Sequence, residues 1–314
     1  MERAKKYRKL LKRGKPMVIP AAHDALTARI IEMAGFELVG ITGFGVSAAF
    51  LGRPDVGLMT QTELVQVTRH ITRSVRVPVS VDADTGYGNA INVMRTVEEL
   101  IQAGAAGIHI EDQVDPKRCG HVAGKRVIPV EEAVGKYKAA DRVRKALNPD
   151  LVLVARTDVR GAPGGTIEDV IQRGNAYVDA GADMVHPEGV LTLDELRLCV
   201  ERIPAPIVYN MVGVSPKASL SELEEIGVAF IADPIGAFLA AARAVYDYMK
   251  ELRTGETDFM IRFSKSLQRH PIADVHAFVG FGEYRELEET FLPKEEVLQR
   301  YEQSVGYQPS KSGN

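Results

Sequence analysis

Three acidic residues mark the ends of two apolar runs in the middle of the sequence. Asp82 closes the run 77–82 and Asp84 stands two positions later, while Glu111 closes the run 107–111. Alternate positions of an extended chain share a face, and three carboxylates at one mouth repel each other unless a cation lies among them. Hard oxygen ligands without paired histidines favour Mg²⁺ or Mn²⁺ over Zn²⁺, and Mg²⁺ takes few carboxylates directly. The simpler interpretation is that the acids cap the turn 86–88 on a solvated rim.

A cysteine lies in a polar, positively charged segment, Pro116-Lys117-Arg118-Cys119-Gly120-His121. Positive neighbours favour a reactive, partly exposed sulfur, which can give a proton to a carbon atom or take one from it. A cysteine is otherwise most often a buried, inert side chain. That second interpretation suits Cys199, which lies in an apolar helical pattern, so we take only Cys119 as a candidate catalytic residue.

An arginine closes another apolar run, 151–156. A charged group in that place is costly unless it meets an anion, and the planar guanidinium of Arg156 fits a carboxylate or phosphate with two hydrogen bonds. Arg156 is therefore a candidate substrate ligand. An ion pair with Asp158 or Glu111 would explain the same residue without a substrate, and the sequence leaves both interpretations open.

The elements that must position these residues repeat eight times along the chain. Short runs that are too apolar for half-exposed strands alternate with amphipathic helical patterns, several of which end in glycine. The expected strands are 17–20, 38–41, 77–82, 107–111, 151–156, 184–187, 207–210 and 229–232, and the expected helices are 24–34, 61–74, 91–103, 131–147, 167–180, 193–203, 220–226 and 237–252. Eight such units predict an α/β fold, a (β/α)8 TIM-type barrel. A doubly wound open sheet is the alternative, but no glycine-rich dinucleotide loop follows the first strand.

Catalytic residues of such barrels gather at the carboxyl ends of the strands and in the loops after them. The polar connection 112–130 is long for a compact barrel, so we expect a lid or a binding loop there. Two more helical patterns, about 257–270 and 285–303, precede a polar tail. We expect one domain, with the barrel over 1–252, a helical extension over 253–305 and a disordered tail over 306–314.

Composition excludes several classes of protein. The 314 residues hold 39 Lys and Arg against 42 Asp and Glu, a formal charge of -3, which argues against a nucleic-acid binder. No apolar run approaches the roughly 20 residues that span a bilayer, so we expect no membrane partner. Two cysteines build no disulfide framework, and we expect a cytoplasmic protein. The basic first fifteen residues predict a short helix that ends at Gly14, with a transit peptide or membrane-surface helix as the alternative.

Taken together, these motifs resemble those of the isocitrate lyase and phosphoenolpyruvate mutase superfamily. The likeness runs from about residue 7 to residue 250, and no single motif carries it. The matching segments are Thr42-Gly43-Phe44-Gly45, Val81-Asp82-Ala83-Asp84-Thr85-Gly86-Tyr87-Gly88-Asn89, Ile110-Glu111-Asp112-Gln113, Lys117-Arg118-Cys119-Gly120-His121 and Ala155-Arg156-Thr157-Asp158. The cysteine segment resembles that of the carbon–carbon lyases, and the chain length resembles the branch that acts on 2-methylisocitrate or 2,3-dimethylmalate.

The resemblance implies a barrel that binds Mg²⁺ and a small 2-oxo or 2-hydroxy acid, commonly as a homotetramer that exchanges a C-terminal helix between subunits. It implies that Asp84 is the direct metal ligand, with Asp82, Asp55 and Glu111 near the metal. Together with the strand ends, it gives as candidates for substrate binding Thr42, Gly43, Phe44, Asp82, Gly120, Arg156, Glu188, Asn210 and Ser215, and for catalysis Cys119, Glu111, His121, Arg156 and Lys117. The segment 117–121 is implied to be a mobile gating loop.

Two segments depart from the superfamily's pattern. After the expected seventh strand the chain is shorter and lacks a glutamate that is common there, in the run Asn210-Met211-Val212-Gly213-Val214-Ser215-Pro216. The expected sixth strand ends in His186-Pro187-Glu188-Gly189, where Glu-Ala is usual. Both lie where the distal part of a substrate is expected, so they bear on the substrate more than on the reaction.

These expectations combine into one hypothesis, the Mg²⁺-dependent cleavage of a 2-hydroxy di- or tricarboxylate into a 2-oxo acid such as pyruvate and a second carboxylate. Cys119 would protonate the second fragment, and Arg156 and His121 would stabilise its charge. The base that takes the hydroxyl proton stays open between Glu111 and a water ligand of the cation. Oxaloacetate hydrolysis and carboxyphosphonoenolpyruvate phosphonomutase chemistry are alternative reactions of the same site. A metal-free barrel that only binds a partner is the alternative outside enzymes.

Overall fold

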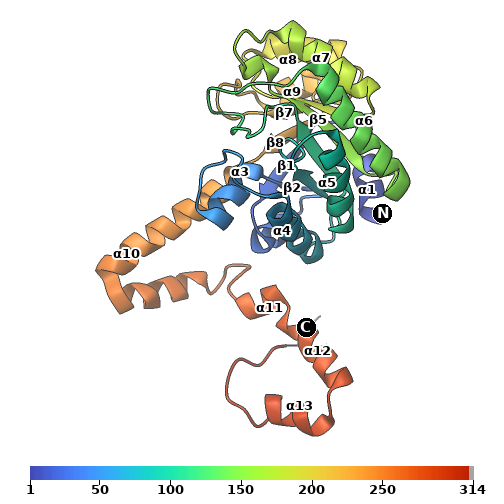
Figure 1. The fold of residues 1–314 in the computed structure, drawn as a ribbon. Coiled ribbons are helices and arrows are strands. Elements are labelled where there is room, and N and C mark those ends of the chain that lie inside the picture. The colour runs from blue at the N-terminus through green and yellow to red at the C-terminus, as the bar shows by residue number, and fades with distance from the viewer. Residues whose placement is uncertain (311–314) are drawn as a thin grey trace. The chain divides into compact units, whose positions relative to one another are not determined.

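Eight parallel strands form the centre of the fold. The structure, a computed structural model, describes residues 1–310 and places the strands side by side in the order β6-β5-β4-β3-β2-β1-β8-β7 (Figure 1). A backbone bridge between Val185 and Ile207 joins β6 to β7 and closes the ring. The strands are β1 (Met17–Ala22), β2 (Val39–Ile41), β3 (Val79–Asp82), β4 (Gly107–Glu111), β5 (Val152–Thr157), β6 (Met184–Pro187), β7 (Val208–Asn210) and β8 (Phe230–Asp233). The predicted (β/α)8 barrel is confirmed, and the open doubly wound sheet is wrong.

Amphipathic helices follow the strands and cover the outer face of the barrel. They are α2 (Ala25–Met33), α4 (Gln61–Ser74), α5 (Ala90–Gln102), α6 (Val130–Leu147), α7 (Ile167–Asp179), α8 (Leu193–Arg202) and α9 (Leu220–Ile226). α10 (Gly236–Leu267) follows β8 along the chain. Side-chain caps define where several of them start: Thr60 and Glu63 form a capping box at α4, and Ser219 and Glu222 form one at α9. All six residues of β5 are buried, as expected for a parallel strand between two apolar layers.

The first helix, α1 (Glu2–Leu10), packs on the barrel through its apolar face. Tyr7 is fully buried, and its ring meets that of Phe230 edge to face at 6.0 Å. The Ser80 hydroxyl donates a hydrogen bond to the Tyr7 hydroxyl over 3.5 Å, and Arg8 pairs with Asp183. The predicted short basic helix is present and ends at Leu10, before Gly14. Among the described residues, no helix has the length and apolar character needed to cross a membrane.

Two short helical segments follow β2, and the sequence does not predict them. α3 (Gly43–Val46) begins where the Thr42 hydroxyl accepts a hydrogen bond from the Gly45 amide over 3.2 Å. The π-helix η1 (Ser47–Leu51) continues it. Segments of four and five residues are too short to show a helical period. A 3₁₀ turn, η2 (Val159–Gly161), follows β5 in the same way.

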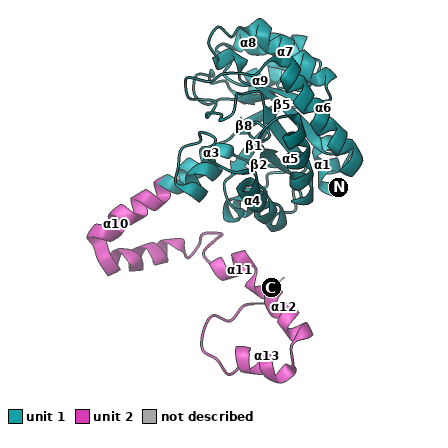
Figure 2. Cartoon of the chain, in the orientation of Figure 1, with its two compact units in different colours: residues 1–242 teal, residues 243–314 magenta. Residues whose placement is uncertain are grey.

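The chain divides into two compact units, residues 1–242 and residues 243–314 (Figure 2). α10 crosses this boundary, and its backbone leaves helical geometry at Glu256. The sequence predicts separate helices there, 237–252 and 257–270. The second unit also holds α11 (Val275–Val279), α12 (Phe281–Phe291) and α13 (Lys294–Tyr301). The predicted domain boundaries stay a prediction.

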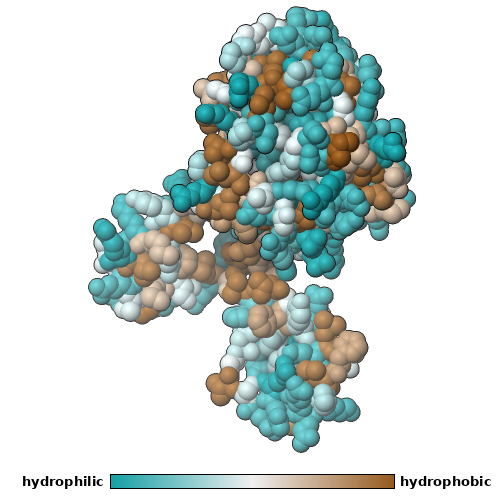
Figure 3. All heavy atoms as spheres, in the orientation of Figure 1, coloured by the Kyte–Doolittle hydropathy of each residue, from teal (hydrophilic) through white to brown (hydrophobic). Residues whose placement is uncertain are grey.

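The end of the described chain contacts the second unit. The Tyr307 hydroxyl donates a hydrogen bond to Asp274 over 2.6 Å, and the ring of Tyr307 stacks on His276 at 4.4 Å. The rest of the tail for which we predict disorder, residues 311–314, lies outside the described residues. Apolar side chains are exposed over the second unit and along α10 (Figure 3). No residue of α10 is buried, and Val245, Tyr246 and Met249 are each more than half exposed.

Candidate active site

The loop that carries the two aspartates ties the ends of β3 and β4 together. The Asp84 amide donates a hydrogen bond to Asp82 Oδ1 over 3.2 Å, and the Asp84 carbonyl accepts one from the Glu111 amide over 2.9 Å. Asp84 and Tyr87 have positive φ angles of 50° and 62°, a left-handed conformation that costs energy in residues with a side chain. The surrounding structure therefore holds a strained backbone where the sequence predicts a metal site.

A lysine from the loop 112–130 supplies a positive charge to the acidic residues. Lys117 Nζ lies 2.7 Å from Asp55 Oδ1 and 2.6 Å from Asp84 Oδ1, and all three side chains are buried. Burial raises the pKa of Asp84 to about 6, against the lowering effect of Lys117. Burial alone would lower the pKa of Lys117, but Asp84, Glu111 and Asp55 together raise it well above its usual value. Lys117 is therefore charged throughout the neutral range.

The acidic residues fit a hard divalent cation. Neither carboxylate oxygen of Glu111 accepts a hydrogen bond although both are buried, and burial raises the pKa of this side chain well above its usual value. Burial acts on Asp82 in the same direction, but Lys117 and Arg156 outweigh it and lower its pKa. Among the described residues, no three acidic, histidine or cysteine side chains are grouped closely enough to hold a metal ion by themselves.

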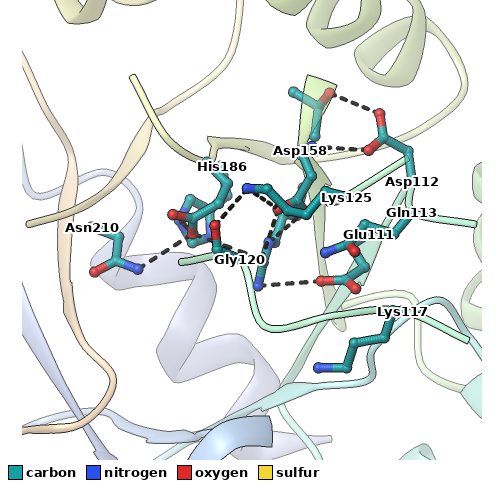
Figure 4. A network of polar contacts seen from close by, with 12 residues as sticks. Glu111, Asp112, Gln113, Lys117, Gly120, Lys125, Asp158, His186 and Asn210 are labelled. Carbon is teal, nitrogen blue, oxygen red and sulfur yellow. Dashed lines mark hydrogen bonds and ion pairs between the residues drawn. The ribbon is translucent and has the colours of Figure 1, made fainter. Parts of the chain in front are cut away.

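Arg156 belongs to a network of charged groups, of which Figure 4 labels Glu111, Lys125 and Asp158. Its Nε and Nη2 donate hydrogen bonds of 2.9 and 3.0 Å to the two carboxylate oxygens of Asp158, and Nη1 lies 3.3 Å from Glu111 Oε2. Lys125 Nζ lies 3.1 Å from Asp158 Oδ1. Burial would raise the pKa of Asp158, but Arg156 and Lys125 outweigh it and hold it far below its usual value. Both ion pairs that the sequence left open are present, and they fix the guanidinium at the cavity wall.

A second buried carboxylate, that of Asp112, stabilises this network through hydrogen bonds with Thr157 and Asp158. Asp112 accepts hydrogen bonds from the Thr157 hydroxyl at 2.7 Å and from the Asp158 amide at 2.9 Å, and Arg173 Nη1 lies 3.0 Å from its Oδ2. The sequence did not reveal Lys125 or Arg173 as parts of the site. Each lies far along the chain from the carboxylate it meets, and neither belongs to a motif that spacing could identify.

The loop 112–130 lies over the mouth of the barrel and brings Cys119 to it. The Cys119 amide donates a hydrogen bond to the Asp55 carbonyl over 3.0 Å. At Gly120 the loop approaches the network so closely that a β-carbon would lie 2.2 Å from Arg156 Nη2. Lys125 Nζ reaches back to the Gly120 carbonyl over 2.5 Å. Only a residue without a side chain fits at this position, which explains the glycine.

The fold raises the pKa of Cys119, whereas the sequence suggested a sulfur activated by positive neighbours. Burial raises the pKa of Cys119, and nearby Asp55 adds to the effect, whereas Lys117 and Arg156 lower it too little to compensate. Lys117, a positive residue near Cys119 in the sequence, is engaged by Asp55 and Asp84 in the fold, so its charge does not activate the sulfur. Cys119 therefore carries a proton at neutral pH, as a general acid must. Cys199 is fully buried in α8, as predicted.

His121 joins the loop to the ends of β6 and β7. Its Nδ1 lies 3.5 Å from Glu188 Oε1, and its Nε2 lies 3.2 Å from Asn210 Nδ2. Burial lowers the pKa of His121 although Glu188 acts in the opposite direction, so the ring is neutral at pH 7. A β-carbon at Gly213 would lie 2.8 Å from Nδ1. The shortened run 210–216 therefore lies directly against the loop.

A cavity of about 100 Å³ lies at this mouth. Of the predicted site residues it is lined by Thr42, Phe44, Asp55, Asp82, Cys119, Gly120, His121, Arg156 and Asn210. The other predicted site residues, which do not line this cavity, are Gly43, Asp84, Glu111, Lys117, Glu188 and Ser215. A β-carbon at Gly43 would lie 3.1 Å from Asp82 Oδ2, and Ser215 is buried in the loop after β7. As the first residues of α3, Gly43 and Phe44 have amides without acceptors in the helix.

Comparisons with known proteins match the whole barrel. A family model described as phosphoenolpyruvate phosphomutase matches residues 7–253. The chain is 41% identical over 298 residues to a 2,3-dimethylmalate lyase of Eubacterium barkeri, and the alignment covers 93% of this chain and 99% of that protein. It is 39% identical over 300 residues to a 2-methylisocitrate lyase of Aeropyrum pernix, with coverage of 95% and 94%. A solved structure of oxaloacetate acetylhydrolase with the inhibitor 3,3-difluorooxalacetate matches with a TM-score of 0.82 and 31% identity, over 91% of this chain and 96% of that one.

Proposed function

The chain belongs to the phosphoenolpyruvate phosphomutase family, and from that premise we propose that it is a Mg²⁺-dependent carbon–carbon lyase. Its substrate would be a 2-hydroxy di- or tricarboxylate of the 2-methylisocitrate or 2,3-dimethylmalate type. The products would be a 2-oxo acid such as pyruvate and a second carboxylate. The two lyases that the chain resembles are named for such substrates.

One observation carries the proposal: a protonated thiol and a fixed arginine face the same small cavity beside a cluster of acidic residues. Cys119 and Arg156 both line the cavity, and the loop backbone at Gly120 lies against the guanidinium. A closed loop of this kind excludes water from a charged intermediate and brings the proton donor to it.

Asp84 and Asp82 would hold the cation, with Asp55 and Glu111 beside it. When bound, Mg²⁺ supplies a Lewis acid for the oxygen atoms of the 2-hydroxy and 2-oxo acids. The amides of Gly43 and Phe44 would hold the carboxylate next to the hydroxyl, since Gly43 lies beside the aspartates and neither amide has an acceptor in the helix.

Cleavage breaks the bond between C2 and C3 of the substrate. Glu111 would accept the hydroxyl proton, since both of its carboxylate oxygens are buried beside the site and accept no hydrogen bond from the described residues. C2 becomes the 2-oxo carbon, and the electron pair of the broken bond stays on the C3 fragment as the enolate of its carboxylate. Arg156 and the neutral His121 would stabilise that charge. Cys119 would then give its proton to C3 and recover one from solvent after the loop opens.

Release of 2-oxo acid tests this proposal directly. A panel of 2-methylisocitrate, 2,3-dimethylmalate, isocitrate, citramalate and oxaloacetate is assayed with Mg²⁺ and again with excess EDTA. We expect release of pyruvate or glyoxylate from at least one hydroxy acid, and its loss in EDTA. Folded protein that releases neither product with Mg²⁺ present would contradict the lyase.

Cys119→Ser tests the role of the thiol. General acid catalysis typically contributes 10²–10⁴-fold, so we expect kcat to fall by about a thousandfold. Affinity for Mg²⁺ and oxalate should be unchanged, because the thiol contacts neither of the groups proposed to bind them. A kcat within about tenfold of the wild type would show that Cys119 is not the acid.

A second reaction is supported by the likeness to oxaloacetate acetylhydrolase. Hydrolysis of oxaloacetate would use the same cation and the same cavity but would yield oxalate and acetate. Oxalate release from oxaloacetate, with no turnover of any hydroxy acid, would favour this reaction. A phosphonate signal in the phosphorus NMR spectrum would instead favour phosphonomutase chemistry.

We also propose that the protein is cytoplasmic and assembles as a homotetramer. The apolar side chains that α10 exposes support self-association, since monomers rarely leave large apolar patches in water.

A further inference from the structure

We infer that Lys125 is a positioning residue, which fixes the segment 119–121 over the cavity by joining its backbone to a buried carboxylate of the barrel. The described residues that line the cavity do not include this lysine. Its effect on a substrate must therefore pass through the segment that carries Cys119 and His121. How Lys125 holds this segment can be measured without turnover, whereas its effect on turnover rests on the proposed lyase function.

The ammonium group of Lys125 joins the loop 112–130 to the residue that follows β5 (Figure 4). Its Nζ donates hydrogen bonds to the Gly120 carbonyl over 2.5 Å and to Asp158 Oδ1 over 3.1 Å. Lys125 is 4% exposed and Asp158 is fully buried. A lysine is almost never buried to this extent unless it is paired, and here a carboxylate and a backbone carbonyl share its charge.

A glycine leaves the room that this lysine occupies. A β-carbon at Gly161, in the η2 turn, would lie 2.6 Å from both Cε and Nζ of Lys125, and real β-carbons essentially never approach another atom within 3.0 Å. Gly189 borders the same space, since a β-carbon there would lie 3.9 Å from Nζ. Any larger residue at position 161 would therefore displace the ammonium group.

Lys125 lies where the base of the loop meets its tip. At the base the Ile128 amide donates a hydrogen bond to the Asp112 carbonyl over 2.9 Å, so the two arms of the loop are paired there. Residues 122–124 of the tip are exposed, and this part of the chain has little packing to hold it in place. The hydrogen bond from Lys125 to the Gly120 carbonyl closes this exposed turn and ties it to the barrel.

Removal of the ammonium group would affect the loop more than the barrel. Asp158 would keep both hydrogen bonds from Arg156, whereas the Gly120 carbonyl would lose its donor. A partly buried carbonyl without a partner is costly, so the segment 119–121 would move outward until water reaches it. Cys119 would then no longer be held at the cavity.

Hydrogen–deuterium exchange of the full chain, followed by mass spectrometry, measures this movement without a substrate. The peptide 117–124 contains the Cys119 amide, which donates its hydrogen bond to the Asp55 carbonyl. Lys125→Met keeps the length of the side chain and removes its charge. We expect this peptide to exchange about ten- to a hundredfold faster in the variant, the range for loss of a hydrogen bond to a charged group.

Peptides from α7 distinguish a local effect from a general loss of stability, because global unfolding would speed their exchange as well. They should keep their wild-type rates in Lys125→Met. Lys138→Met, at an exposed position of α6, is the matched control and should leave the peptide 117–124 unchanged. An acceleration of this peptide by less than fivefold, or an equal acceleration of the α7 peptides, would overturn the positioning role.

Gly161→Ala disturbs the lysine without changing its charge. The added methyl group would lie 2.6 Å from Cε and Nζ of Lys125, so this variant should also speed exchange of the peptide 117–124 at least tenfold. In a Lys125→Ala background the same change should add less than twofold, because the side chain that it displaces is gone. Fully additive effects of the two changes would show that Lys125 does not hold the loop from this place, and would overturn the inference.

Turnover connects Lys125 to the proposed function. With the best substrate of the lyase panel, we expect kcat/KM of Lys125→Met to fall by about ten- to a hundredfold. Affinity for Mn²⁺, measured by electron paramagnetic resonance, should stay unchanged because Lys125 contacts neither Asp55 nor Asp84. Unchanged kcat/KM despite faster exchange would overturn the positioning role and leave the lyase standing. A wild-type chain that releases no 2-oxo acid would overturn the lyase, while the expected exchange rates would still support the hold of Lys125 on the loop.

Discussion

The protonation state of Cys119 depends on which groups its charged neighbours bind in the fold. In the sequence Lys117 and Arg118 stand beside it, whereas in the fold Lys117 binds Asp55 and Asp84. The carbonyl of Asp55 also accepts the Cys119 amide, so an acidic residue adjoins the thiol. A proton donor is useful only while it holds its proton, and burial together with this acid keeps it there.

We predict that the alkylation rate of Cys119 depends on pH in a way that reports its pKa. Because the pKa of Cys119 is raised above the usual value of 9.0, iodoacetamide should modify it slowly at pH 7, with a rate that rises through a midpoint above pH 9. Turnover should fall over the same range as the thiol loses its proton. Mass spectrometry follows the modification, and Cys119→Ser is the control because Cys199 is buried. A midpoint below pH 7 would show a thiolate at neutral pH and exclude the acid role.

Gly120 makes a second prediction at the scale of one residue. Gly120→Ala would place a methyl group 2.2 Å from Arg156 Nη2, so the loop could close only by shifting. We expect kcat to fall at least tenfold with little change in the free energy of unfolding, since the residue lies in a surface loop. The matched control is Gly135→Ala in α6, where a β-carbon meets nothing within 4 Å. That change should leave kcat unchanged and stabilise the helix by about 0.5–1 kcal/mol.

At the scale of elements, Lys117 ties the loop 112–130 to the ends of the strands. Lys117→Met would leave Asp55 and Asp84 without their buried cation. Breaking a buried pair from one side typically costs about 3–5 kcal/mol, and protonation of Asp84 would relieve part of this. Without Mg²⁺ the variant should therefore unfold at a lower temperature than the wild type.

Addition of Mg²⁺ should raise the melting temperature of Lys117→Met more than that of the wild type, because the ion replaces the missing charge. Lys125→Met is the control, since Lys125 binds Asp158 and the Gly120 carbonyl and contacts neither Asp55 nor Asp84. An equal effect of Mg²⁺ on both variants would show that the lysine and the ion do not serve the same carboxylates.

The elements also show what the sequence can predict. β4 and β6 have the predicted bounds, and α4 and α9 do as well, because short apolar runs and capping residues are local signals. α3 and η1 were missed because their shape depends on the Thr42 cap and on packing, not on a period. The acids, Cys119 and Arg156 could be identified since strand ends share one mouth. Lys125 and Arg173 could not, because only the closed fold brings them to Asp158 and Asp112.

At the scale of the whole molecule, the exposed apolar residues of α10 predict an assembly. The mass of the full chain in solution, measured by light scattering after gel filtration, should be four times the 34.3 kDa of one chain. Val245→Glu with Met249→Glu should shift the mass toward the single chain, because both side chains are more than half exposed and apolar. Lys250→Glu, an exposed polar position on the same helix, is the matched control. A monomeric wild-type chain would contradict the homotetramer.

The ring of strands has its fewest backbone pairings between β6 and β7. Between β6 and β7 the described backbone forms a single isolated bridge, Val185 to Ile207, whereas the other neighbouring strands pair over two or more positions. On the side of the mouth, three contacts join the ends of these two strands. They connect Glu188 with Asn210, Asn210 with His121 of the loop, and His121 with Glu188. Two of these three contacts belong to His121, so opening of the loop 112–130 would leave only the hydrogen bond between Asn210 and Glu188. Turnover that opens and closes this loop, as proposed above, would therefore loosen and restore the join between β6 and β7, and the barrel itself would move with its lid.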